Sequence, residues 1–308
     1  GTLIENSLAE LWSIFDFLMP QYLFNYHYFQ KQYESSIVKN NDEEKTKQLK
    51  KLVTPFILRR NKKEVLKELP DKIEQNMILP FSDEEEKIYV ANLAKVNEEL
   101  QQLYDIEGSD KMQILKMLTR LRQLCLEPRL VYDNIDQPSS KLKACMELIK
   151  TMQENKQKVL LFSSFTSALG LIAEECQKTG ITYYMLTGST NKEERRELVS
   201  RFQKDDTTLF LISLKAGGTG LNLTSAENVI HYDPWWNVSA QNQATDRAYR
   251  IGQKSNVQVF NLVMKDSVEE KIIEMQKRKK ELADMFVENN SGGLSQMSKE
   301  DILSLFTM

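Results

Sequence analysis

The chain has 308 residues, of which 41% are hydrophobic and 28% are charged, a balance that excludes a wholly disordered chain and a membrane protein. The length predicts two structural units, and the net charge of −3 differs from the basic charge of a typical nucleic-acid-binding domain. Three widely spaced cysteines and two histidines fit neither a disulfide framework nor a zinc site, so we expect an intracellular protein with no metal ligands of its own.

The first residues predict a helix. The segment GTLIENS has no initiating methionine and reads as a turn into a helix, so we expect the chain to be a piece of a longer protein. Ser7 and Glu10 have the spacing of a capping box, in which each side chain bonds the backbone N–H of the other residue. Apolar residues follow at helical spacing until Pro20 ends the pattern. These positions are Leu8, Leu11, Trp12, Phe15 and Leu18.

A strand and two longer helices are predicted next. Even spacing of Ile73, Met77 and Leu79 indicates a strand that bridges two helical regions. Ser82 and Glu85 form a second capping box, which begins a long amphipathic helix. Residues 112–126 predict a second helix that can pack against the first as an antiparallel neighbour. The apolar stripe of the long helix is Tyr89, Leu93, Val96, Leu100 and Leu103.

The polar segment from Tyr132 to Ser140 is the predicted internal boundary, since it contains a proline and no apolar periodicity. Beyond it, strand-like runs alternate with helical patterns, which predicts a parallel sheet flanked by helices. A third capping box is expected at Thr190 and Glu193, and a last helix from Ser267 to about Asn289. The strand-like runs are KVLLFS, TYYML, TLFLISL, NVIHY and VQVFNLV.

The glycine-rich segment from Ala216 to Asn222 is a candidate phosphate contact. It is not a Walker A loop, because no lysine follows the glycines and nothing in the chain matches G-x-x-x-x-G-K-[ST]. It is not a dinucleotide fingerprint, because only about seven residues separate Gly220 from the strand at Asn228. Two interpretations remain: a loop whose backbone contacts phosphates, and an ordinary tight turn that needs glycine.

A second candidate lies in the segment from Gln241 to Gln253, which predicts a helix that ends near Gly252. Arg247 and Arg250 are three residues apart and would share one helix face, with Gln243 and Asp246 in a neighbouring row. Such a pair most often forms surface salt bridges. The preceding DPWWN segment places Trp235 and Trp236 at a strand-to-helix junction, where two adjacent indoles cannot easily both be buried.

Taken in order, these segments resemble the Swi/Snf family of helicase-like ATPases, within helicase superfamily two. Leu3 stands where the family pattern usually has proline, and Tyr249 where many members have histidine. The resemblance covers nearly the whole chain. It rests on PFILRRNKKEVLKELPDKIE, LRQLCLEPRL, SSKLKACMELI, KVLLFSSFT (motif IV), YYMLTGSTNKEERRELVSRF, LISLKAGGTGLNLTSAENVIHYDPWWN (motif V), QATDRAYRIGQ (motif VI) and SVEEKIIEMQKRKKELAD.

The resemblance implies an α/β fold, a RecA-like parallel sheet flanked by helices and preceded by family-specific helical segments. It assigns residues 1–80 to the helical tail of a first motor lobe and a bridging segment, and 81–138 to a helical protrusion of the second lobe. Residues 139–266 would form the RecA-like helicase C-terminal lobe, and 267–308 a brace helix and tail.

The family also implies an ATP-dependent motor on double-stranded DNA. ATP with Mg²⁺ would be bound mainly by a first RecA-like lobe that this chain lacks, with no Walker A or Walker B, so we expect the chain alone to be inactive. The resemblance makes Arg247 and Arg250 arginine fingers positioned by Gln243, and places Gly218, Gly220 and Asp246 beside the nucleotide. It assigns sequence-independent DNA contacts to Ser163, Ser164, Thr187, Lys215, Ala216, Gly217, Thr219, Asn222 and Trp236.

Two other functions are open from the sequence. One is a DNA- or protein-binding scaffold built on a motor fold without catalysis, which an upstream phosphate loop in the parent reading frame would exclude. The other is an RNA helicase, which the PFILRR and RIGQ segments disfavour. We expect nucleoprotein complexes as further partners and no membrane contact. The expected location is the cytoplasm or nucleoid of a prokaryote or the nucleus of a eukaryote.

Overall fold

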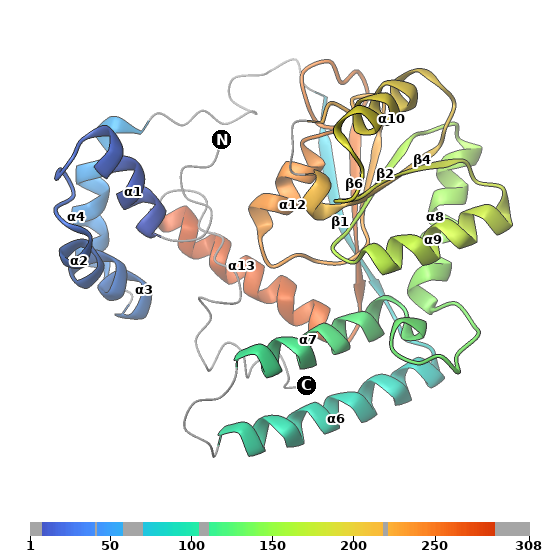
Figure 1. Ribbon diagram of the computed structural model, residues 1–308, viewed down its shortest axis with the longest axis horizontal. Helices are drawn as coiled ribbons and strands as arrows, with labels where there is room; N and C mark the ends of the chain where they lie inside the picture. Colours follow the sequence, from blue (N-terminus) through green and yellow to red (C-terminus); the bar gives the residue numbers. More distant parts are fainter. Residues whose placement is uncertain (1–7, 41, 58–69, 105–110, 218–220, 287–308) are drawn as a thin grey trace. The chain divides into compact units, whose positions relative to one another are not determined.

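The computed structural model describes residues 8–40, 42–57, 70–104, 111–217 and 221–286 (Figure 1). These residues form two compact units. The first contains the described residues up to 57, together with 236–239 and 274–286. The second contains 70–235 and 240–273. Among the described helices, none has the length and apolar character needed to cross a membrane.

The first unit is helical. Its predicted apolar stripe is largely confirmed, because Leu8, Leu11 and Phe15 are buried, whereas Leu18 is 65% exposed. Ser7 of the predicted capping box lies outside the described residues. The elements are α1 (Leu8–Leu18), α2 (Tyr26–Phe29), the π-helix η1 (Gln30–Glu34), α3 (Ser35–Asn40), α4 (Glu43–Val53) and the 3₁₀ helix η2 (Thr54–Phe56).

The second unit is built on a six-stranded sheet, in which every pair of neighbouring strands is parallel. This confirms the predicted α/β fold and all of the predicted strands. The strand order is β1-β6-β5-β2-β4-β3, so β1 is an edge strand that pairs with β6, about 185 residues further along the chain. The strands are β1 (Lys72–Leu79), β2 (Val159–Ser163), β3 (Tyr183–Leu186), β4 (Leu209–Ser213), β5 (Asn228–His231) and β6 (Val257–Met264).

Alternation along the strands divides the core of this unit between the two faces of the sheet. Leu161 and Leu211 pack with α8 (Ser140–Glu154) and α9 (Thr166–Thr179) on one face. Leu160 and Phe210 pack on the other face, with residues from α10 (Lys192–Lys204), α11 (Leu214–Gly217) and α12 (Val238–Thr245). Both faces are therefore covered, as the parallel arrangement requires.

Helices α6 (Asp83–Tyr104) and α7 (Lys111–Leu126) run antiparallel beside each other, as predicted (Figure 1). The capping box of α6 is also confirmed, because Ser82 N donates to Glu85 Oε2 at 2.8 Å and Glu85 N to Ser82 Oγ at 3.4 Å. The 3₁₀ helix η3 (Pro128–Leu130) follows α7. After β6 comes α13 (Val268–Phe286), whose first turn is tied to α8 by the buried ion pair between Lys141 and Glu269.

Two local predictions were wrong. The N-cap of α10 is Asn191, whose side chain accepts from Glu193 N and Glu194 N, whereas the hydroxyl of Thr190 accepts from Thr187 N instead. The helix expected to end near Gly252 ends at Thr245. Residues 246–252 form turns in its place, so Arg247 and Arg250 do not share a helix face.

Candidate functional site

The predicted contact residues gather at the carboxyl edge of the sheet. Ser163 ends β2 and is in register with Ser213, which ends β4 and precedes Lys215. Thr187 follows Leu186, the last residue of β3. Parallel strands bring their carboxyl ends to one edge, where open α/β sheets bind their ligands. The fold thus brings together segments that are separated by up to about 50 residues in the sequence.

Asp233, two residues after β5, organises the turn that follows β2. Ser163 Oγ donates to Asp233 Oδ1 at 2.7 Å, and Ser164 N donates to the same oxygen at 3.0 Å. Ser164 Oγ donates to Asp233 Oδ2. Ser163 is fully buried, so its hydroxyl holds the turn and does not face solvent. A contact between this hydroxyl and a DNA phosphate would require the bond to Asp233 to break.

Arg122, on α7, completes this cluster from the helical hairpin. Its Nη2 donates to Asp233 Oδ2 and to Ser164 Oγ, both at 2.9 Å. Its guanidinium also lies over the rings of Phe165 and Trp235, 4.9 and 5.6 Å from their centroids. Sequence reasoning missed both Arg122 and Asp233. The available signal was a charged residue on the apolar face of a predicted helix, and an acid directly after a buried strand.

The glycine loop begins in α11. Lys215 is exposed, whereas Ala216 and Gly217 are buried. A Cβ on Gly217 would lie 2.9 Å from Cε1 of Phe162, closer than side-chain contacts allow, so close packing on the sheet requires glycine here. Gly218, Thr219 and Gly220 lie outside the described residues.

Both ends of this loop are held by α10. Arg195 Nη1 donates to the carbonyl of Ala216 at 3.3 Å, and Gln203 Nε2 donates to the carbonyl of Asn222 at 2.7 Å. The side chain of Asn222 is left exposed. A nearby hydroxyl, Thr187 Oγ1, is half-buried and lies 2.8 Å from Ser189 Oγ. Among the described DNA contacts that were predicted, Lys215 and Asn222 are therefore exposed, and Thr187 and Ser164 are half-buried.

The two arginines lie in the turns after α12. Arg247 is held by its backbone, because Leu223 N donates to its carbonyl at 3.0 Å, and Arg250 Nη1 donates to the carbonyl of Leu221 at 3.5 Å. Both bonds go to the segment directly after the glycines. The end of α12 is fixed from the sheet by His231, whose Nε2 lies 2.9 Å from Thr245 Oγ1.

The electrostatics of this turn come from two like charges at close range. Burial lowers the pKa of the half-buried Arg247, the charge of Arg250 lowers it further, and Asp246 opposes both effects. Arg250 is exposed, and no carboxylate of the described residues lies within ion-pair distance of it. Two neighbouring guanidiniums whose charges repel form a place where a polyanion is stabilised.

The other predicted residues are less exposed. Gln243 and Asp246 are half-exposed. Trp235 is partly buried, and its backbone N donates to Gln241 Oε1 at 3.3 Å. Trp236 is only 7% exposed. The expectation that the two indoles would not both be fully buried is confirmed.

Comparison with protein families gives two matches. Residues 1–130 match the SNF2-related domain, and residues 140–252 match the helicase conserved C-terminal domain. Together the two matches cover strands β1 to β5, the helices of the first unit up to η2, and the hairpin of α6 and α7.

Two curated relatives illustrate the range of similar proteins. A putative ATP-dependent helicase/translocase of Bacillus subtilis is 38% identical over 317 positions, which include 100% of this chain and 34% of that protein. An ISWI chromatin-remodeling complex ATPase of Saccharomyces cerevisiae is 33% identical over 325 positions, which include 99% of this chain and 28% of that protein. The chain thus spans about a third of the length of the curated relatives that it matches.

Solved structures agree with these matches. The SWI2/SNF2 ATPase core of Sulfolobus solfataricus in complex with double-stranded DNA is 33% identical, with a TM-score of 0.62 over 99% of this chain and 65% of that one. The C-terminal part of the Fun30 ATPase domain is 25% identical, with the same TM-score over 77% of this chain and 97% of that one.

Proposed function

Because the chain belongs to the Swi/Snf family of helicase-like ATPases, we propose that it is the second motor lobe of an ATP-dependent double-stranded DNA translocase or remodelling ATPase. The observation that carries the proposal is the turn after α12, where Arg247 and Arg250 are anchored to the segment after the glycines. Two cationic residues bonded to the segment that follows the glycines support a site for phosphates.

ATP with Mg²⁺ would supply the phosphoryl group whose transfer to water drives such a motor. The nucleotide would be held mainly by a first lobe, since nothing in this chain matches a Walker A or Walker B motif. The residues here suit a polyphosphate because the charges of Arg247 and Arg250 repel each other, and an anion near them would offset that repulsion. Asp246 and Gln243 would keep the two side chains in place.

In this role Arg247 and Arg250 act as arginine fingers. Their guanidiniums would stabilise negative charge on the phosphoryl oxygens during transfer, which is worth about 10³ to 10⁵ in rate in related phosphoryl-transfer enzymes. The partial desolvation of Arg247 strengthens this interaction, because Coulomb attraction grows as water is excluded.

DNA would lie along the same edge of the sheet. Lys215 and Asn222 are exposed there and Thr187 is half-exposed, and hydroxyls, amides and ammonium groups bind phosphates without reading bases. Binding would therefore be independent of sequence, with Trp236 and the glycine loop as further contacts. Nucleoprotein complexes are the proposed targets of the whole protein.

The test is made in the whole protein that contains this lobe. Arg247→Ala and Arg250→Ala are each expected to lower DNA-stimulated kcat by about 10³ while the DNA affinity changes by less than about twofold. Arg196→Ala is the matched control, since Arg196 is an exposed arginine of α10. Turnover near the unsubstituted level in both variants would remove the arginine fingers from the proposal.

The isolated 308-residue chain gives a second check. Without a phosphate-binding lobe it is expected to show no ATP hydrolysis, with or without duplex DNA. DNA-stimulated turnover by this chain alone contradicts its assignment as a half-motor.

A further inference from the structure

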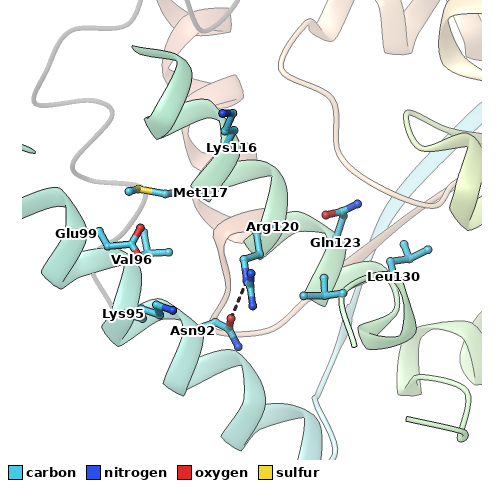
Figure 2. Close-up of a pocket in the computed structure, with 10 residues that line it drawn as sticks. Asn92, Lys95, Val96, Glu99, Lys116, Met117, Arg120, Gln123 and Leu130 are labelled. Atoms are coloured by element: carbon cyan, nitrogen blue, oxygen red, sulfur yellow. Dashed lines mark hydrogen bonds between the residues drawn. The ribbon is translucent and has the colours of Figure 1, made fainter. Parts of the chain in front are cut away.

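An open cavity of about 380 Å³ lies between α6 and α7 (Figure 2). Four of its lining residues decide its chemistry. Lys95 and Glu99 come from α6, and Lys116 and Arg120 come from α7. Figure 2 shows the side chains of Lys116 and Arg120 along one wall, opposite those of Lys95 and Glu99.

The guanidinium of Arg120 is held in place by neutral groups. Its Nε donates to Asn92 Oδ1 at 3.0 Å and its Nη2 to Tyr132 Oη at 3.2 Å. Hydrogen bonds from Asn92, and then from Arg120, lower the pKa of Tyr132, as expected for a phenol that faces donors and positive charge. Arg120 is therefore positioned before any ligand arrives, and its charge is not neutralised by these partners.

The two lysines have no acidic partner either. In the described part of the chain, Lys95, Lys116 and Arg120 take part in no ion pair within 4.0 Å. Glu99 is the one carboxylate among the lining residues. Three cations against one carboxylate leave the cavity with an excess of positive charge.

Of the other six lining residues, Asn92 and Gln123 are polar and four are apolar. Val96 and Met117 are 4% and 8% exposed, and Leu130 and Val131 are half-buried. A cavity with an apolar floor and a cationic rim can bury one or two apolar side chains and pair with the acids beside them.

We propose that this groove between α6 and α7 binds a short acidic peptide segment of a partner protein, with apolar side chains on Val96 and Met117 and flanking carboxylates at Lys95, Lys116 and Arg120. The interaction is separate from the motor chemistry, because none of these residues is among the predicted nucleotide or DNA contacts. It would serve to recruit or regulate the lobe.

The charge of the hairpin disfavours DNA as the occupant. Helices α6 and α7 together carry six acidic and six basic residues, so no extended positive surface exists for a duplex backbone. The apolar residues of the lining would gain nothing from contact with phosphates. A short peptide can use the local excess of cations and the floor at the same time.

The probe is a fluorescein-labelled hexapeptide of sequence EDLFDE, whose binding to the 308-residue chain is followed by fluorescence anisotropy. Saturable binding is expected, and Lys95→Glu/Lys116→Glu is expected to weaken it by about tenfold or more, since two attractive pairs become repulsive. Both lysines are exposed, so the double variant should fold. The peptide EDSSDE, with the apolar pair replaced, should bind at least about fivefold more weakly.

The matched control is Lys150→Glu/Lys204→Glu, which makes the same charge change at exposed lysines of α8 and α10. Equal weakening in the control overturns the proposal, as does equal binding of the two peptides. If a 20-base-pair duplex displaces the peptide and the groove variant loses DNA affinity to the same extent, the occupant is nucleic acid and the proposal is wrong. None of these results concerns DNA-stimulated turnover by the whole protein. The groove and the motor function are therefore tested separately.

Discussion

Arg122 Nη2 lies 2.9 Å from Asp233 Oδ2, although the two residues are 111 positions apart and their side chains are only 8% and 1% exposed. This ion pair joins the helical hairpin to the sheet at the turn after β2. Asp233 also accepts hydrogen bonds from the hydroxyls of Ser163 and Ser164. The positions of the turns after β2 and β5 therefore depend on a helix that precedes both in the sequence.

Removing one partner of this pair should cost much of the stability of the unit. Arg122→Met leaves Asp233 buried without its cation, which is expected to lower the free energy of unfolding by about 3 to 5 kcal/mol. Urea denaturation followed by circular dichroism measures the loss.

Two variants qualify that result. Arg120→Met, the same substitution on an exposed arginine two residues earlier, should cost about 1 kcal/mol or less. Arg122→Met/Asp233→Asn should be less destabilised than the two single changes combined, because no unpaired charge is left. Strict additivity would show that the pair is not coupled.

Gly217 is predicted to be a packing requirement. Gly217→Ala pushes a methyl group against the ring of Phe162 and should lower stability by about 1 to 3 kcal/mol, measured by thermal unfolding. Phe162→Leu in the same chain should recover part of that loss. Gly170→Ala is the control, because nothing lies within 4 Å of a Cβ at this position in α9, and it should be neutral or stabilising by up to about 1 kcal/mol.

Lys215 is predicted to contact DNA phosphates. Lys215→Ala should weaken binding to all duplex sequences alike and reduce the slope of log affinity against log salt by about one. Lys150→Ala is the control, since Lys150 lies near the end of α8, which leads to the amino end of β2. An unchanged slope in Lys215→Ala would place the phosphate contacts elsewhere.

His231 should make the stability depend on pH. Burial lowers its pKa from the usual 6.5 to about 4. Below about pH 6.5 the imidazole of His231 is therefore protonated in the unfolded chain but not in the folded chain. The free energy of unfolding falls as the pH drops from 6.5 towards 4. Between pH 7.5 and 5 this amounts to roughly 2 kcal/mol at this position.

The difference between His231→Gln and the unsubstituted protein isolates that contribution. Urea midpoints at the two pH values should fall less steeply in the variant. A parallel decline in both proteins would show that His231 accepts its proton without unfolding.

Much of the fold could be predicted from local patterns, because strand alternation and helical stripes reflect burial on one or two faces. The strands from Val159 onward and the pairing of α6 with α7 follow directly from such periodicity. Chain order then brings the segments after β2, β3 and β4 to one edge of the sheet. The general location of the candidate site is therefore accessible from sequence.

What could not be predicted depends on distant contacts. The turn that carries Arg247 and Arg250 is held by backbone bonds to Leu221 and Leu223, and no helical propensity reveals them. Thr190 and Asn191 are both good N-cap residues. Thr187 N donates to the hydroxyl oxygen of Thr190, which leaves Asn191 to cap the helix. Local patterns mark Arg122 and Asp233 as unusual positions, but they do not show that the two residues pair with each other.

The pairing of β1 with β6 has a consequence for synthesis on the ribosome. In the described sheet β6 is the one neighbour of β1, and Lys72 lies opposite Val257. The edge strand therefore remains unpaired until the ribosome has translated some 185 further residues and β6 has been synthesised. A nascent chain stalled before β6 exposes the unpaired backbone of β1, which can pair with a strand of another sheet. The sheet is therefore completed late in synthesis, and chaperones would need to protect β1 until then.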